Sequence, residues 1–355
     1  MTAKKLQIEY CEYNLDLKHT FTVSSFSRIL TPCLLLRLTY DGIIGYGEAS
    51  MPQYLGENIS DSLNFLQHIK QSKLTHPENI DENLNYINSI SEGCSSIKAA
   101  LDIALHDIFG KLENRSWAKH QNYNLKHSLV SSYTIGIDSE EMIIKKVKEA
   151  SEFEILKVKL GTPDDKKIIS TIRKNTGSYL YVDANQGWKD KEKTLELICW
   201  LKENNALLVE QPFPVNMIKE TEWLMQKSPL PIFADESIKR IEDIELVKNV
   251  FNGINVKLMK FGGIRQSEKI IKLAKESGMQ IMLGCMTETS CGISAASQII
   301  PLADYADLDG NLLIKNDPFE GSRIQDGKIS VSDYPGIGIR NINNEHHLEF
   351  KKLFD

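Results

Sequence analysis

Short apolar runs that end in polar or charged residues recur from Ser131 to Gly310. Each run is followed by a charged stretch with apolar residues at helical spacing, and the runs start roughly 20 to 27 residues apart, as strand-helix units do. Eight such units predict a closed parallel barrel. An open doubly wound sheet is the alternative, but it usually begins with a glycine-rich turn that this chain lacks. The runs are "SYTIGI", "ILKVKLG", "YLYVDAN", "ALLVEQP", "PIFADES", "GINVKLM", "QIMLGCM" and "YADLDG".

The first third of the chain has a different pattern. "CLLLRLTYDGIIGYGEA" predicts two strands joined at Asp41-Gly42, and "SSIKAALDIALHDIFGKL" has the spacing of a buried helix. After the eighth run, "KISVSDYPGIGI" predicts a strand and a turn that return to this first unit. A chain of 355 residues exceeds the usual size of one core. We therefore expect an α+β unit packed closely on the barrel.

The predicted barrel strands end almost entirely in ionisable residues. Active sites of such barrels are built at the C-terminal ends of the strands. A single charged strand end is often only a helix cap or a salt-bridge partner, but five consecutive charged ends favour chemistry. The charged residues at the ends of strands two to six and eight are Lys157, Lys159, Asp183, Glu210, Asp235, Lys257, Asp307 and Asp309.

Three carboxylates fall on adjacent strands: Asp183, Glu210 and Asp235. Such a cluster repels itself unless a cation neutralises it, and oxygen ligands without His or Cys select Mg²⁺ or Mn²⁺. These residues are the predicted metal ligands. A structural salt-bridge network with the lysines is the alternative.

Two lysines are predicted to face each other across the barrel mouth. Lys159 and Lys257 end strands two and six, which lie four apart in a ring of eight. This arrangement suits removal of a carbon-bound proton on one face and its return on the other, with a cation stabilising the enolate. Lys157 shares a strand face with Lys159, roughly 7 Å away, and their repulsion of roughly 2.5 kcal/mol is expected to lower the pKa of Lys159 towards that of a base.

Composition narrows the partners. The formal charge of -6 gives no case for nucleic acid or an anionic membrane. The N-terminus lacks the apolar core of a signal peptide, and no stretch has the length of a membrane span. Six scattered cysteines without ligand spacing predict reduced thiols and a cytoplasmic protein. A small molecule is the expected partner; a homo-oligomer is possible.

"LKVKLG", "VDANQGW", "VEQPF", "ADES" and "NVKLMKFGGI" resemble the ordered strand-end motifs of the enolase superfamily, muconate-lactonizing subgroup. The resemblance spans nearly the whole chain. It implies a (β/α)7β modified TIM barrel over 128–324, a cap over 1–127 with 325–355 contributing, one Mg²⁺ per subunit, and Lys159 and Lys257 as the acid/base pair, a pairing known for this superfamily. It leaves Lys260 out as a loop residue.

The eighth run narrows the resemblance further. "ADLDG" resembles the Asp-x-Asp motif of dipeptide epimerases, in which two carboxylates bind the substrate's α-ammonium, and a strand-end cap is the alternative. By this resemblance Lys157 helps to hold the substrate carboxylate. Residues expected to line the peptide are Thr134, Cys285, Met286 and Thr287.

Substrate choice is expected to depend on the cap loop within "HTFTVSSFSRI". In the resembling family this loop contacts the side chain of the C-terminal residue, and members that act on Ala-Glu tend to carry an Arg there. The alignment places Phe26 at that position, with Arg28 two residues later. Phe26 in the pocket favours a small or apolar residue, as in Ala-Ala, whereas Arg28 in the pocket favours L-Ala-D/L-Glu. We favour the small apolar dipeptide, and either would suit cell-wall peptide metabolism.

Two other functional classes remain open. One is a lyase or cycloisomerase of the same superfamily, such as an o-succinylbenzoate synthase or a muconate cycloisomerase. Their substrates have no ammonium for Asp307 and Asp309 to bind, which disfavours them. The other is a binding protein that keeps the fold, which would have little need for five charged strand ends. The sequence therefore predicts an isomerase.

Overall fold

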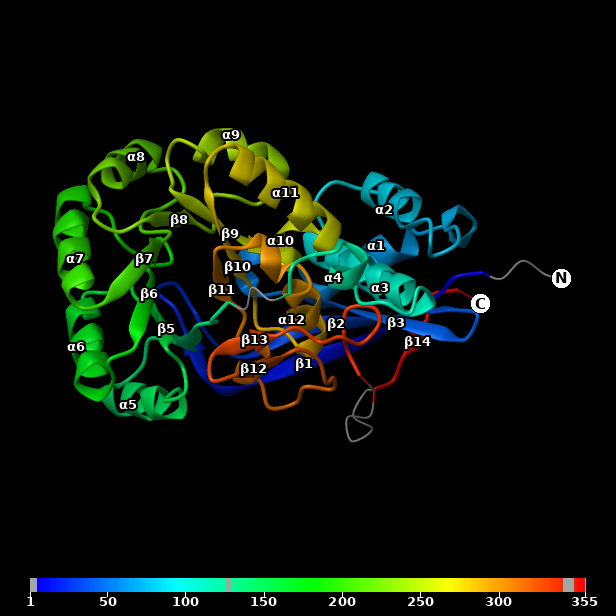
Figure 1. Ribbon diagram of the computed structural model, residues 1–355, viewed down its shortest axis with the longest axis horizontal. Coiled ribbons are helices and arrows are strands. Elements are labelled where there is room, and N and C mark those ends of the chain that lie inside the picture. Colours follow the sequence, from blue (N-terminus) through cyan, green and yellow to red (C-terminus); the bar gives the residue numbers. More distant parts are fainter. Residues whose placement is uncertain (1–4, 126–128, 341–347, 355) are drawn as a thin grey trace.

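The computed structural model describes residues 5–125, 129–340 and 348–354. Figure 1 shows a cap, with its first three sheet strands in blue and its helices mostly in cyan, beside a ring of strands surrounded by helices. No helix among the described residues is long and apolar enough to cross a membrane.

The cap sheet is antiparallel in the order β14-β1-β2-β3. Its strands are β1 (Gln7–Thr22), β2 (Ser27–Tyr40), β3 (Ile43–Ser50) and β14 (Lys351–Lys352). Asp41 and Gly42 join β2 to β3 with φ angles of 52° and 80°, and positive φ at both positions is what a tight hairpin turn requires. The predicted hairpin is confirmed.

A long buried helix, α3, connects the cap to the barrel. One side of α3 packs on β2 and β3, so closely that a side chain at Gly47 would collide with the carbonyl of Ala100. Its other side packs on barrel helices, where the Asp102 carboxylate accepts a hydrogen bond of 2.6 Å from the Ile264 amide. The cap helices are η1 (Gln53–Leu55), α1 (Ile59–Gln67), η2 (Gln71–Lys73), α2 (Ile80–Ser89), α3 (Ser95–Leu112) and α4 (Trp117–His120).

Eight parallel strands form the barrel, in sequential order from β4 to β11. A parallel bridge between Ser131 and Ala306 joins the first strand to the last and closes the ring. All eight predicted strands are confirmed. Their bounds are β4 (Tyr133–Ile135), β5 (Ile155–Lys159), β6 (Tyr179–Asp183), β7 (Ala206–Glu210), β8 (Ile232–Ala234), β9 (Gly253–Lys257), β10 (Gln280–Gly284) and β11 (Tyr305–Asp307).

Helices cover the outside of the barrel after each of the first seven strands, whereas the short turn η5 follows the last. This is the predicted (β/α)7β arrangement. Polar caps start several helices; the Ser139 hydroxyl, for example, accepts from the Met142 amide at the start of α5. The elements are α5 (Glu140–Glu149), α6 (Asp165–Asn175), α7 (Lys191–Glu203), α8 (Ile218–Lys227), η3 (Ile241–Asp243), α9 (Ile244–Val247), α10 (Leu258–Phe261), α11 (Ile264–Glu276), α12 (Ser290–Ser297), η4 (Ile300–Leu302) and η5 (Gly310–Leu313).

After the barrel the chain returns to the cap. β12 (Arg323–Gln325) and β13 (Lys328–Ser330) form a hairpin, so the strand predicted within "KISVSDYPGIGI" is present. The Leu353 amide then donates to the Ile8 carbonyl beside β14. The predicted boundary between residues 127 and 128 lies outside the described residues, and the division into 1–127 with 325–355 and 128–324 remains a proposal.

The turn between β1 and β2 reaches the barrel mouth. The Thr22 carbonyl accepts from the Ile137 amide after β4 at 3.0 Å, and the Ser24 hydroxyl donates to the Asn185 carbonyl after β6 at 3.0 Å. The cap loop predicted within residues 19–29 therefore lies over the C-terminal ends of the barrel strands.

Candidate active site

A cavity of about 110 Å³ lies between the cap loop and the strand ends. Asp183 and Glu210 lie behind its wall, where both contact Lys157. The structure therefore brings every predicted site residue to one place. Those that line the cavity are Phe26, Arg28, Thr134, Lys157, Lys159, Asp235, Lys257, Cys285, Met286, Thr287, Asp307 and Asp309.

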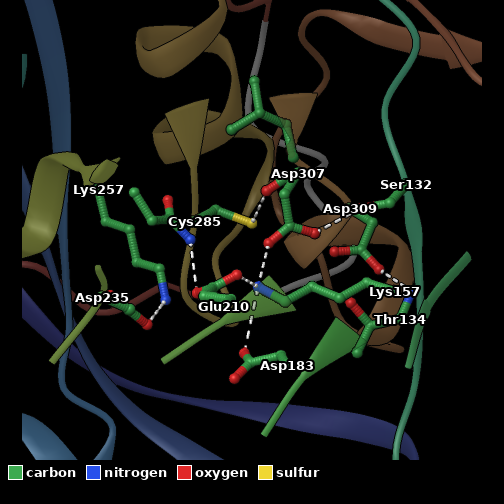
Figure 2. A network of polar contacts seen from close by, with 12 residues as sticks. Ser132, Thr134, Lys157, Asp183, Glu210, Asp235, Lys257, Cys285, Asp307 and Asp309 are labelled. Carbon is green, nitrogen blue, oxygen red and sulfur yellow. Dashed lines mark hydrogen bonds and ion pairs between the residues drawn. The ribbon is translucent and has the colours of Figure 1, made fainter. Parts of the chain in front are cut away.

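Lys157 occupies the centre of the charged cluster, as Figure 2 shows. Its ammonium lies 2.7 Å from Glu210, 2.8 Å from Asp307 and 3.4 Å from Asp183, and the residue is 1 % exposed. Burial acts to lower the pKa of this ammonium, but the carboxylates, Asp307 first, raise the pKa well above its usual value. Lys157 therefore stays protonated, and the carboxylates around it balance its positive charge.

That placement corrects one argument from the sequence. The expected repulsion between Lys157 and Lys159 treated Lys157 as an isolated positive neighbour. Three carboxylates surround it instead, and their charges screen its field. The lysine that folding places beside Lys159 is therefore not a source of net positive charge.

Lys159 and Lys257 end β5 and β9, with three strands between them on one side of the ring. The Lys159 ammonium lies 2.6 Å from Asp183, and the Lys257 ammonium lies 2.7 Å from Asp235. Both lysines line the cavity, and both residues are less than 9 % exposed. The predicted placement of two amines on different sides of one cavity is therefore present.

The predicted metal ligands Asp183, Glu210 and Asp235 end or follow three adjacent strands, and their exposures are 0 %, 0 % and 2 %. Burial and the Asp183 charge raise the pKa of Glu210 to about 7. Burial opposes ionisation of Asp235, but the lysines 257 and 260 hold its pKa well below the usual value. Among the three carboxylates, Glu210 is therefore the one whose charged form is least stabilised.

This donor set fits a hard divalent cation, since it consists of buried carboxylates with no His or Cys. Each of the three carboxylates is held by at least one lysine ammonium. As they stand, the described residues contain no group of three or more acidic, His or Cys side chains placed to hold a metal ion. The three residues therefore fit a divalent cation by the type of their donor atoms, which are carboxylate oxygens.

Contrary to the expectation from the sequence, Lys260 does not lie in a loop; leaving it out of the acid/base pair remains a prediction. It lies in α10, is 2 % exposed, and its ammonium lies 2.5 Å from an Asp235 carboxylate oxygen and 2.9 Å from the Asp235 carbonyl. Burial lowers its pKa. The turn of helix directly after β9 folds Lys260 back under the strand ends, which spacing along an extended strand could not indicate.

Sequence reasoning also missed Asn255 and Glu236. The Asn255 amide donates to Glu210 at 2.8 Å, and the residue is 0 % exposed. Glu236 follows Asp235, lines the cavity, and has a pKa raised to about 7 by burial and by the Asp235 charge. Alternation could have found Asn255, because it lies two residues before Lys257 and faces the same side of β9.

Asp307 and Asp309 lie beside each other but have different partners. One Asp307 oxygen accepts from the Ser132 hydroxyl at 2.7 Å, and the other pairs with Lys157. An Asp309 oxygen accepts from the Thr134 amide at 2.6 Å. Burial, and then the Asp307 charge, raise the pKa of Asp309 to about 7. The pair therefore favours an additional cation in the cavity (Figure 2).

The wall formed by residues 285–287 follows β10. The Cys285 thiol donates to the Asp307 carbonyl at 3.3 Å, and burial raises its pKa well above the usual value, so Cys285 is a packed thiol with no nucleophilic character. The Met286 amide donates to Glu288 at 2.7 Å. The first contact ties the loop to the last strand, and the second lies within the loop.

Both cap-loop residues reach the cavity. The Arg28 guanidinium lies 5.1 Å from the centre of the Phe21 ring and 5.7 Å from that of Phe26, and it donates to the Thr287 hydroxyl at 2.8 Å. Phe26 and Arg28, which the sequence offered as alternatives for this pocket, therefore both line it. An aromatic ring and a guanidinium share this part of the wall.

Residues 142–344 match the sequence model of the family described as enolase C-terminal domain-like. The chain belongs to this family. Among its relatives is an L-Ala-D/L-Glu epimerase of Bacteroides thetaiotaomicron, 47% identical over 339 residues that cover 95% of this chain and 88% of that protein. The resemblance drawn from five strand-end motifs is confirmed.

Solved structures of the family agree in fold. A dipeptide epimerase from Cytophaga hutchinsonii, complexed with Mg and D-Ala-L-Val, superposes with a TM-score of 0.90 at 28% identity, covering 99% of this chain and 100% of that one. An N-succinyl Arg/Lys racemase from Bacillus cereus gives 0.89 at 26% identity, covering 98% and 100%. Since two activities share nearly the same score, the fold of this family does not choose the substrate.

Proposed function

We propose that the protein is a dipeptide epimerase that inverts the α-carbon of the C-terminal residue of a dipeptide. One observation carries the proposal: an acidic pair, Asp307 and Asp309, opens into the same cavity as Lys159 and Lys257. The acidic pair provides a site for a free ammonium, and the lysines provide two proton carriers. The 47% identical relative named as an epimerase supports the same activity.

The dipeptide is held at both ends. Its ammonium binds Asp309 and the Asp307 carboxylate, and its carboxylate lies towards Lys157 and the proposed metal ligands Asp183, Glu210 and Asp235. One Mg²⁺ per subunit at these carboxylates would supply positive charge that stabilises negative charge developing on the substrate carboxylate. The Mg present in the Cytophaga hutchinsonii complex supports this cofactor.

Proton transfer is then a task for the two lysines. One lysine, in its neutral form, takes the α-proton from one face of the carbon, and the other, as an ammonium, donates a proton to the opposite face. Lys157 stays charged throughout, because its three carboxylate neighbours hold the proton on it. Thr134 and residues 285–287 line the peptide between the two ends.

Arg28 favours an acidic C-terminal residue. A guanidinium in the wall of a pocket binds a carboxylate through paired hydrogen bonds, whereas Phe26 alone would have favoured a small or apolar side chain. Because both line the cavity, the positive charge decides, and we propose Ala-Glu ahead of the small apolar dipeptide favoured from the sequence. The name of the Bacteroides thetaiotaomicron relative supports this order.

The test is incubation of the purified protein with Mg²⁺, D₂O and a dipeptide panel that includes L-Ala-L-Glu and L-Ala-L-Ala. Mass spectrometry and chiral analysis are expected to show one deuterium at the α-carbon of the C-terminal residue together with inversion. Absence of exchange in every dipeptide would refute the proposed function.

Asp309→Asn is expected to raise KM for dipeptides by roughly 10- to 100-fold, because a hydrogen bond to a charged group is lost. Burial and the Asp307 charge raise the pKa of Asp309 to about 7, so the wild-type carboxylate becomes mostly ionised as the pH rises above that value. The defect of the variant should therefore be largest above pH 7. KM measured from pH 6 to 9 checks this expectation.

The exposed turn residue Asp326 offers a matched control. Asp326→Asn makes the same chemical change far from the cavity and should leave KM unchanged. An N-acetylated dipeptide has no ammonium. Its remaining turnover should therefore be the same in the wild type and in Asp309→Asn. Equal KM of Asp309→Asn and wild type for the free dipeptide would remove the ammonium role.

Three predictions from the sequence are also part of this proposal. They are a cytoplasmic location, a role in cell-wall peptide metabolism and a possible homo-oligomer. All six cysteines are free thiols in the structure.

A further inference from the structure

Thr287 connects the cap loop to the barrel wall. Its hydroxyl accepts the hydrogen bond of 2.8 Å from the Arg28 guanidinium, and the residue is 3 % exposed. Arg28 comes from the start of β2 in the cap, whereas Thr287 follows β10 in the barrel. This polar contact holds the guanidinium against the cavity wall.

The cap also fixes Thr287. The Ser50 hydroxyl, at the end of β3, donates to the Thr287 carbonyl at 2.5 Å. Two residues further on, the Thr289 amide donates to the Glu48 carboxylate at 3.0 Å. These contacts hold both the carbonyl and the following turn against one rigid strand, so the Thr287 hydroxyl is a fixed acceptor.

Arg28 is also placed relative to the chemistry. Its guanidinium lies 5.1 Å from the centre of the Phe21 ring, and the Lys159 ammonium lies 5.9 Å from the same point. The two cations are thus no more than about 11 Å apart. This upper limit is compatible with a glutamyl side chain of roughly 4 Å extending from the α-carbon beside Lys159 to the guanidinium, with roughly 3 Å for the contact at each end.

We infer that Thr287 is a positioning residue for substrate selection: its hydroxyl orients Arg28 so that the guanidinium meets a carboxylate on the side chain of the C-terminal residue. This inference rests on the proposed function. An arginine side chain has several rotamers, and a guanidinium already oriented before binding loses less conformational entropy when it binds. Thr287 acts through Arg28 and does not itself contact that carboxylate.

The test compares Thr287→Val, which keeps the shape of the side chain and removes the hydroxyl, with Thr287→Ser, which keeps the hydroxyl. The measured quantity is the ratio of kcat/KM for L-Ala-L-Glu to that for L-Ala-L-Ala. Thr287→Val is expected to lower this ratio roughly tenfold, mainly through a higher KM for L-Ala-L-Glu. Thr287→Ser is expected to keep the wild-type ratio.

Thr31 provides a matched control. It is a buried threonine of the cap strand β2, and its hydroxyl makes no hydrogen bond in the part of the chain that the structure describes. Thr31→Val should keep the wild-type ratio. A double variant, Arg28→Met with Thr287→Val, should have the same ratio as Arg28→Met alone, because the hydroxyl acts only through Arg28.

The outcomes separate the two levels of the proposal. If the wild type epimerises no dipeptide, the proposed function fails. If the wild type is active and Thr287→Val lowers kcat/KM for both dipeptides by the same factor, the residue is merely structural and the inference is overturned. If Thr287→Val keeps the wild-type kcat/KM for both dipeptides, the inference is likewise overturned, while the epimerase activity stands.

Discussion

Replacing either Lys159 or Lys257 by alanine is expected to lower the rate of epimerisation roughly 10²- to 10⁴-fold, the usual contribution of one acid/base group. Epimerisation needs a proton carrier on each face of the α-carbon, and the two lysines end β5 and β9 on different sides of the ring. Loss of either carrier therefore slows net inversion by this factor. Chiral analysis of the product measures it directly.

The two variants should nevertheless differ in isotope exchange. In each variant the remaining lysine still removes and returns the α-proton of the isomer whose hydrogen faces it. Lys159→Ala should therefore exchange deuterium into one isomer without inversion, and Lys257→Ala into the other. Deuterium incorporation, followed by mass spectrometry in both isomers of the dipeptide, separates these results.

Lys272, exposed on α11, supplies the control. Lys272→Ala makes the same change on the surface and should epimerise like the wild type. If Lys159→Ala and Lys257→Ala exchanged the same isomer, the two lysines would serve one face of the substrate, and the two-base arrangement would be wrong.

Glu210→Gln is expected to abolish the response of the protein to Mg²⁺ and to lower epimerisation by roughly 10³-fold or more. Glu210 is 0 % exposed, and burial together with the Asp183 charge raises its pKa to about 7, so a cation at this place would stabilise the charged form of Glu210. A ligand that binds only the folded state raises its melting temperature. The wild type should show such a rise on addition of Mg²⁺, and Glu210→Gln should not.

Glu196 on the outer helix α7 gives the matched control, because it is exposed and far from the strand ends. Glu196→Gln should keep both the Mg²⁺-dependent rise in Tm and the activity. Removal of metal from the wild type with a chelator should reproduce the loss of activity. A Mg²⁺-dependent Tm rise of wild-type size in Glu210→Gln would exclude Glu210 as a ligand.

The barrel could be predicted because each strand carries its own signal. A run such as "YLYVD" is short, mostly apolar and ends in a charged residue, and this pattern can be recognised without knowing which strands lie beside it. Closure of the ring then fixes which ends meet, so the carboxylates of β6 and β7 and the residue after β8 had to be adjacent. The same reasoning placed Lys159 and Lys257 on different sides of one cavity.

The charged neighbours of Lys157 and Lys260 could not be predicted in this way. Spacing placed Lys157 next to Lys159, but the charge that Lys157 presents depends on Asp307, 150 residues away in sequence, and on Glu210. Lys260 lies in α10, just after the extended strand, and the turn of that helix places its ammonium beside Asp235. Spacing along a strand predicts the face on which a side chain lies. It does not predict which charged residues from distant parts of the chain lie around that side chain in the folded protein.

The sequence by itself determined the order of the strands, the residues at their ends and therefore the inventory of the site: three carboxylates, two opposed lysines and an acidic pair. Those follow from local periodicity and from the geometry of any closed parallel barrel. Only the tertiary structure decided how the cap meets the barrel. The Arg28 guanidinium donates to Thr287 across 259 residues of chain, and this contact between cap and barrel places its positive charge in the cavity wall.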